Sequence, residues 1–293
     1  MTLTLPTTTR DLALDVLRQH AAKFAEHAPQ VGADSDPEHV HQTRVATRRM
    51  RAALRVFGDA LPQELADLDA ELKWIAGLLG AVRDLDVQIA RLHDTAVSLG
   101  ETHAVAPYGG WLEEQRQRAM TSLIDAFASE RFASLTERLT CLDHVAPDPG
   151  QDHPLQDDAP PRLKRAYRKL RNAGSDLTVD SPAPAFHRAR IQAKRLRYAV
   201  EFLAPVYGKP AERLISRVTD LQDLLGDHQD GIVSSQRIHE AVHTAAGAWP
   251  AETSVALGRV LQWEAQHGED LRRRFPATHQ EVQDAWKRLR RSL

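Results

Sequence analysis

The sequence HQTRVATRRMR at residues 41–51 is repeated in altered form as HRARIQAKRLR at residues 187–197. Each stretch begins with a histidine and carries at least four cationic side chains, with no acid among them. The two stretches lie 146 residues apart in a chain of 293 residues. A protein that contains such a segment twice is expected to place two sources of positive charge so that they face a polyanion.

Helical spacing places the cations of each stretch on one side of a helix. At about 100° per residue, an arc of about 80° holds His41, Arg44, Arg48, Arg51 and Arg55. Val45, Met50 and other apolar residues occupy the opposite side. Like charges at this spacing destabilise an isolated helix, so a bound anion that neutralises them is a natural reason for the pattern.

The offset of 146 residues extends beyond the basic stretches and predicts an internal duplication. Leu78-Leu79-Gly80 aligns with Leu224-Leu225-Gly226, and Asp84 aligns with Asp230. Good helix formers dominate and aromatic residues make up 5%, which predicts an all-α fold. Four helices are expected in each half, with the fourth a candidate for a break. The expected helices are 8–28, 38–57, 62–100 and 106–141, and then 160–173, 184–204, 210–245 and 251–291.

This pattern predicts two four-helix bundles related by pseudo-two-fold symmetry. The N-terminal half spans 1–145 and the C-terminal half spans 161–293. Residues 146–160 are rich in Pro and Asp and are expected to form the linker between them.

The charge distribution supports a polyanionic ligand although the net charge is only −2. Residues 41–57, 162–171 and 186–197 carry 16 of the 38 Lys and Arg residues and no Asp or Glu. The rest of the chain has 22 Lys and Arg against 40 Asp and Glu, a net charge of −18. Concentrated basic charge creates a local field, and an acidic remainder disfavours indiscriminate binding.

The paired His-x-x-Arg-x-x-x-(Arg/Lys)-Arg-x-Arg segments and the Leu-Leu-Gly…Asp elements resemble the CHAD family, the conserved histidine α-helical domain. The resemblance covers roughly residues 8–291. It implies an all-α fold of two four-helix bundles and non-catalytic binding of inorganic polyphosphate, with association with polyphosphate granules. Some members carry a separate triphosphate-tunnel catalytic domain, which these residues are not expected to include.

The resemblance and the repeat together assign polyphosphate binding to a set of cations and two histidines in a cleft or pore between the halves. Glu201 departs from the repeat, because it stands where the first half has Arg55, and it is expected to close that end with an ion pair. The candidate binding residues are His41, Arg44, Arg48, Arg49, Arg51, Arg55, His187, Arg190, Lys194, Arg195, Arg197, Arg18 and Lys164.

Two other functions remain open on the sequence alone. A nucleic-acid-binding helical module fits the basic stripes, but Tyr198 is the one aromatic residue within them, and stacking aromatics are typical of such proteins. A phosphohistidine carrier or phosphohydrolase would use His41 or His187, although no recognisable catalytic motif occurs. No catalysis is therefore expected.

No cofactor or metal is expected either. His39 and His41 point about 200° apart on a helix and would not share one ion. Asp84, Asp227 and Asp230 could hold a divalent metal, but acids beside arginines more often orient the guanidinium groups. The single cysteine, Cys141, and the lack of a signal peptide or an apolar span favour a cytoplasmic protein without membrane contact. Other granule-associated proteins are candidate partners.

Overall fold

The computed structural model describes residues 6–33, 36–145, 153–244 and 248–293. Within these ranges the chain is helical, with one isolated β-bridge between Thr8 and Pro154 and no strand, so the expected all-α fold is confirmed. The α-helices are α1 (Thr9–His27), α2 (Pro37–Phe57), α3 (Leu68–Leu99), α4 (Ala106–Phe127), α5 (Glu130–Thr140), α6 (Leu155–Gly174), α7 (Ala183–Tyr207), α8 (Lys209–Thr244) and α9 (Ala251–Leu289).

Local capping explains where several helices begin and end. The Asp36 side chain accepts a hydrogen bond from the Glu38 N–H at 2.9 Å, and Pro37 is the first residue of α2. Ser129 accepts from the Phe132 N–H and starts α5, which divides the expected helix 106–141. Gly100 has a φ of 70°, a conformation that favours glycine, and ends α3.

Two expected helix starts are wrong. Helix α3 begins at Leu68 and not at residue 62, because a short 3₁₀ turn, Gln63–Leu65, comes first and buries Leu65. Helix α6 begins at Leu155, inside the expected linker. Its first turns bury Leu155 and Ala159, which stabilises the helix despite Pro160 and Pro161. Residues 146–152 of that expected linker lie outside the described residues.

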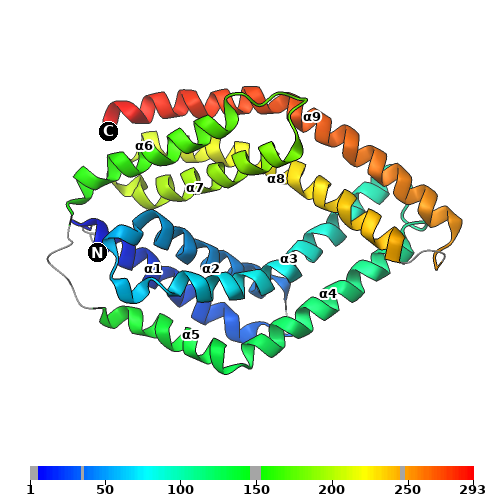
Figure 1. Ribbon diagram of the computed structural model, residues 1–293, viewed down its shortest axis with the longest axis horizontal. Coiled ribbons are helices and arrows are strands. Elements are labelled where there is room, and N and C mark those ends of the chain that lie inside the picture. Colours follow the sequence, from blue (N-terminus) through cyan, green and yellow to red (C-terminus); the bar gives the residue numbers. More distant parts are fainter. Residues whose placement is uncertain (1–5, 34–35, 146–152, 245–247) are drawn as a thin grey trace.

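The helices form two groups that meet at both ends (Figure 1). Within α1–α5, each of the first four helices packs against the next, and the same order of contacts recurs in α6–α9. At one end α2 contacts α7 and α1 contacts α6. At the other end α3 contacts α8 and α9, and α4 contacts α9. The helices of the two basic stretches, α2 and α7, therefore lie side by side.

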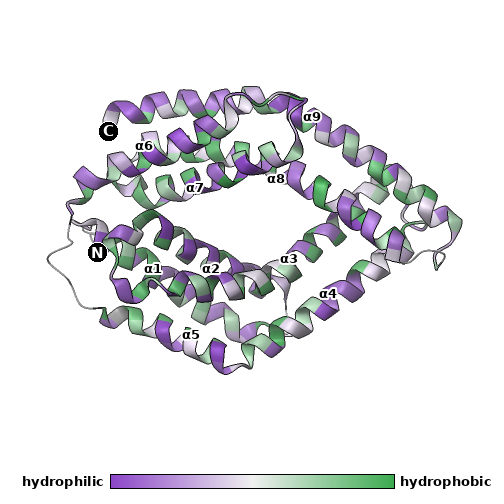
Figure 2. Cartoon of the chain, in the orientation of Figure 1, coloured by the Kyte–Doolittle hydropathy of each residue, from purple (hydrophilic) through white to green (hydrophobic). Residues whose placement is uncertain are grey.

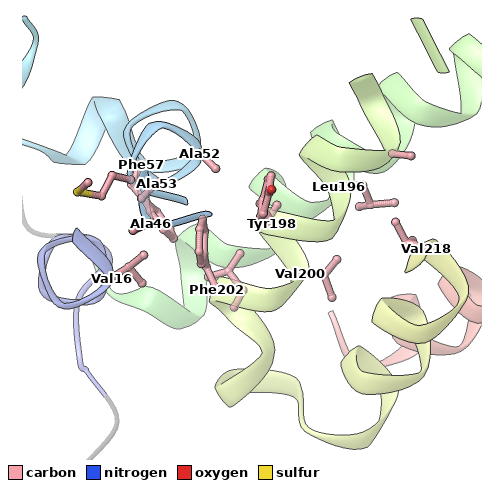
Figure 3. Close-up of a cluster of buried hydrophobic side chains, with 14 of the residues drawn as sticks. Val16, Ala46, Ala52, Ala53, Phe57, Leu196, Tyr198, Val200, Phe202 and Val218 are labelled. Carbon is pink, nitrogen blue, oxygen red and sulfur yellow. The ribbon is translucent and has the colours of Figure 1, made fainter. Parts of the chain in front are cut away.

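The larger hydrophobic core joins the two groups of helices. Ala53 and Phe57 of α2 lie beside Tyr198 and Phe202 of α7 (Figure 3). The rings of Phe57 and Phe202 are 5.9 Å apart. A second, smaller core forms where α3 and α4 meet α8 and α9, around buried residues such as Tyr108. Apolar burial thus ties the two groups together at both ends.

No helix in the described part of the chain combines the length and the apolar character that crossing a bilayer requires.

Candidate functional site

A pocket of about 560 Å³ lies among α2, α3, α6 and α7. Small apolar side chains and Tyr198 form part of its wall, and cations from α2, α6 and α7 form the rest. Hydrophilic residues run along α2, beside the other half of the chain (Figure 2). The nine cationic lining residues are Arg44, Arg48, Arg51, Arg55, Arg162, Arg165, Lys169, Lys194 and Arg195. None of the described residues that line this basic pocket is acidic.

Acids that do not line the basic pocket form ion pairs with three of the α2 arginines. The Arg51 Nε donates to Asp69 at 2.9 Å, and an Nη of Arg55 lies 3.7 Å from the same carboxylate. Arg44 and Asp84 are 3.5 Å apart. These carboxylates fix guanidinium groups while leaving donors for a ligand, because a guanidinium has five N–H groups.

Arg48 lies at the centre of the α2 stripe and is incompletely satisfied. Its Nε is buried and has no hydrogen-bond partner among the described residues. Its guanidinium lies 5.8 Å from the centre of the buried Tyr198 ring, a cation–π contact that helps to position it. Burial lowers the pKa of Arg48 below its usual value. A buried donor without a partner costs free energy that an entering anion could recover.

The α7 helix contributes Arg190, which lies outside the pocket lining, and Lys194, a partly buried lysine within it. The Arg190 Nε is also buried without a described partner, and burial lowers the pKa of this side chain. Lys194 lies one turn further along α7. Burial lowers its pKa to about 7, and the neighbouring Arg190 and Arg48 add to the shift by repulsion. Burial, together with the neighbouring cations, therefore leaves Lys194 partly deprotonated near neutral pH.

Glu201 links the two basic helices. One carboxylate oxygen lies 2.5 Å from the Arg197 Nε on the same helix, and the other lies 2.9 Å from an Nη of Arg49 on α2. The ion pair expected at this end of the stripe is confirmed, and the structure adds a partner from the other half. Arg49 and Arg197 are consequently held by Glu201 and do not line the basic pocket.

The two histidines of the repeated stretches lie outside the lining of the basic pocket. His41 is partly buried on α2, where burial and then Arg83 lower its pKa below 6.5. His187 is exposed, and its Nδ1 is 2.8 Å from the Gln229 Oε1. His41 is thus mainly neutral at neutral pH, which disfavours a charge-based contribution of its side chain to polyphosphate binding.

Two further candidates are also placed away from the basic pocket. The Arg18 Nε donates to the carbonyl of Leu142 at 3.2 Å, and an Nη of Arg18 lies 3.6 Å from Asp15. Lys164 is exposed on α6 and is not among the lining residues.

The acids after the paired Leu-Leu-Gly elements mainly hold cations. Asp227 accepts from Arg91 at 2.6 Å, and Asp84 pairs with Arg44, so the expected orienting role is confirmed for these two acids. Arg91 of α3 also forms a two-pronged pair with Glu264 of α9, at 2.7 and 2.6 Å. Within the described ranges, no group of three or more His, Cys, Asp or Glu side chains is arranged to hold a metal ion.

The sequence model of the CHAD domain matches residues 15–239, which include both basic helices and the basic pocket. This chain belongs to the CHAD-domain family. Two curated relatives from Mycobacterium tuberculosis, the proteins MT2285 of strain CDC 1551 / Oshkosh and Rv2226 of strain ATCC 25618 / H37Rv, are each 29% identical over 269 residues. These matches cover 86% of this chain and 49% of each relative, so the chain spans about half their length.

Two solved structures share the fold of this CHAD domain. PptA from Streptomyces chartreusis superposes with a TM-score of 0.71 at 22% identity, covering 96% of this chain and 100% of that one. The CHAD domain from the plant Ricinus communis superposes with a TM-score of 0.75 at 23% identity, covering 97% and 94%.

Helix α6 forms one wall of the basic pocket, and the candidate residues chosen from the sequence did not include the side chains of this wall. Arg162, Arg165 and Lys169 of α6 line it, whereas Lys164 was the α6 residue selected from the sequence. The signal was present, because residues 162–171 carry six cations and no acid. Positions 162, 165 and 169 share one helical face, which a search for i, i+3 and i+7 spacing would have separated from Lys164. Arg162 is also held in place by Asp158 and Asp59.

Proposed function

We propose that this CHAD domain binds inorganic polyphosphate, without catalysis, in the basic pocket between its two halves. The observation that carries the proposal is the set of nine cations around one pocket that has no acid in its described lining. Family membership supports the same ligand class, since CHAD domains are associated with polyphosphate binding. A polyphosphate chain carries a negative charge on each internal phosphate and therefore matches a continuous basic surface.

The unpaired donors support an oxyanion ligand in particular. The buried Nε of Arg48, in the pocket lining, and that of Arg190, outside it, have no described partner, and phosphate oxygens are strong acceptors for such donors. Arginine supplies forked donors and lysine a point charge, and both occur in the basic pocket. Phosphate release is not part of the proposal.

The aromatic content of the pocket lining favours phosphate over nucleic-acid bases as the ligand. Tyr198 is the aromatic residue in its lining, and it is buried against Arg48 and Arg49 rather than presented as a stacking surface. Single-stranded nucleic acid usually binds through stacking on exposed aromatic rings.

We further propose that polyphosphate granules are the place of action and that granule-associated proteins are further partners.

The test is a binding titration with polyphosphate of defined length at two salt concentrations. The double variant Arg165→Gln/Lys169→Gln removes two exposed cations from the basic pocket. We expect at least a tenfold loss of affinity, about 1.4 kcal/mol. The log-log salt slope should become shallower by roughly 1 to 2, because fewer counterions are released.

The matched control is Arg168→Gln/Arg171→Gln, which removes two exposed cations of the same helix that are not in the pocket lining. A loss in the control equal to that in the pocket variant would mean that diffuse electrostatics carries the binding. Tighter binding of single-stranded DNA of equal charge than of polyphosphate would favour the nucleic-acid function. A third variant, Lys164→Gln, tests the assignment made from the sequence.

A further inference from the structure

Lys194 occupies an unusual place in the basic pocket. It lines the pocket, its side chain is partly buried, and it forms no ion pair with a carboxylate in the described part of the chain. The acid that acts on it electrostatically is Asp230 of α8, whose own pKa is raised by burial. The cations around Lys194 are Arg44 and Arg48 of α2, Arg190 and Arg195 of α7, and Arg165 and Lys169 of α6.

This environment makes the Lys194 amine a nucleophile at neutral pH. With its pKa lowered to about 7, about half of the side chain is uncharged at pH 7. An ordinary lysine, with a pKa of about 10.4, is uncharged to less than about 0.1% at that pH. A desolvated lysine beside other cations is a recognised form of activated amine.

The arginines near Lys194 would also bind the phosphate of an acyl phosphate, which is the group that leaves when such a reagent acylates an amine. Arg44 and Arg48 line the pocket beside Lys194, and guanidinium groups stabilise the negative charge that develops on a departing phosphate. A small acyl phosphate combines a phosphate for these arginines with a carbonyl carbon for the amine. Binding the phosphate would bring the carbonyl close to Lys194 and raise its local concentration.

We infer that Lys194 is a site of covalent acylation by small acyl phosphates, an inference that rests on the proposed binding of phosphate groups in the basic pocket. The neutral Nζ attacks the carbonyl carbon, a C–N bond forms, and the C–O bond to the phosphate breaks. The phosphate leaves with the bonding electron pair and takes up the proton that the amine loses. The products are an amide and inorganic phosphate, and no other reactant is needed.

Acylation would regulate polyphosphate binding. The amide cannot be protonated, so the pocket loses the positive charge that Lys194 gains when an anion raises its pKa. The added acyl group also occupies part of a pocket of about 560 Å³. An acylated protein should therefore bind polyphosphate at least threefold more weakly.

The experiment exposes the full chain to acetyl phosphate at pH 7 and measures acetylation of each lysine by peptide mass spectrometry over time. Lys194 should be acetylated at least tenfold faster than the exposed Lys164. Lys169 is an internal comparison, because it lines the same pocket but is exposed. Polyphosphate added beforehand should protect Lys194, and Arg48→Gln should slow its acetylation by removing a phosphate ligand.

The functional consequence is measured on the same samples by polyphosphate titration before and after acetylation. Wild-type protein should lose affinity, whereas Lys194→Arg protein should show the same affinity before and after treatment. Acetylation of Lys194 no faster than that of Lys164, in protein that binds polyphosphate, would overturn the inference and leave the proposed function standing. Rapid acetylation of Lys194 in protein that does not bind polyphosphate would instead contradict the proposed function and support a pocket for small acyl phosphates.

Discussion

At the scale of single residues, Lys194 and Arg48 are two cations of the basic pocket whose charged forms are disfavoured by burial and by neighbouring cations. Both lie midway along the two basic stripes, and both are pushed toward their uncharged forms by burial. For Arg48 the change leaves the charge intact, because an arginine titrates far above neutral pH. For Lys194 it brings the titration to about pH 7. Lys194 is therefore a pocket side chain whose charge changes near neutral pH.

Polyphosphate binding should weaken as pH rises through about 7. A bound polyanion favours the charged amine, so it raises the pKa of Lys194 from about 7, and binding takes up a proton above that pH. We expect affinity to fall by at least threefold between pH 6.5 and 8.5 at constant ionic strength, measured by titration. Lys194→Arg, which stays charged, should remove most of this dependence. A wild-type affinity that is constant over this range would contradict the assignment.

Replacing Lys194 with methionine should stabilise the ligand-free protein. The folded-state pKa of about 7 lies below the unfolded value near 10.4, so the folded state binds fewer protons between these values. The destabilisation is therefore complete below about pH 7 and disappears as pH rises toward about 10. Lys194→Met should raise the free energy of unfolding by about 1 kcal/mol at pH 6.5 and by less at pH 9.5. Urea unfolding at both values measures this, and an equal gain at both would argue against it.

At the scale of helices, one acid pairs with arginines of both basic helices. Helices α2 and α7 are both cationic and yet in contact. Glu201 lies between Arg49 of α2 and Arg197 of α7, and its side chain is 13% exposed. Apolar contacts such as Phe57 against Phe202 act on the same pair of helices.

Removing this carboxylate charge should weaken the packing of α2 against α7. Glu201→Gln leaves Arg49 and Arg197 without their shared partner, and breaking a largely buried ion pair is costly. We expect a loss of about 2 kcal/mol in the free energy of unfolding, measured by thermal or urea unfolding without ligand. Glu281→Gln is the control, because Glu281 pairs with Arg217 at the exposed surface and such pairs contribute little. Equal effects of the two substitutions would show that Glu201 does not hold the helices together.

At the scale of the whole molecule, the two halves share a core. Residues of α1, α2 and α3 belong to the same buried cluster as residues of α6, α7 and α8. At the far end Arg91 of α3 pairs with Glu264 of α9, whose side chain is 1% exposed. The division into 1–145 and 161–293 follows the repeat in the sequence, but burial does not follow that division.

A fragment of residues 1–145 should not fold as a stable monomer. It would expose Phe57 and other residues that the second half covers, and an exposed apolar surface of this kind favours association or unfolding. We expect sedimentation to show dimers or larger species, or circular dichroism to show non-cooperative unfolding. Adding a fragment of residues 153–293 should restore cooperative unfolding. A monomeric, cooperatively folded 1–145 would instead show that each half is an independent domain.

Residue spacing and composition along the chain were enough to predict the two basic helices and their cationic faces. Helix α2 was expected at 38–57 and spans Pro37–Phe57, and α7 was expected at 184–204 and spans Ala183–Tyr207. These features depend on spacing, capping and composition within about 20 residues, which a sequence displays directly. The family followed from the same local pattern, because the two basic stretches are its most specific feature.

Packing between helices sets which of those cations line one pocket. It brought Arg165 and Lys169 from α6 into the lining, left His41 and His187 outside it, and joined Arg49 to Glu201. Each of these outcomes depends on which face of one helix packs against another, and helical spacing alone does not fix that. Burial of Lys194 is the clearest case, because its pKa depends on groups brought together from α2, α7 and α8. Local sequence sets the charge of a side chain, but the dielectric and the neighbours that change its titration exist only in the packed fold.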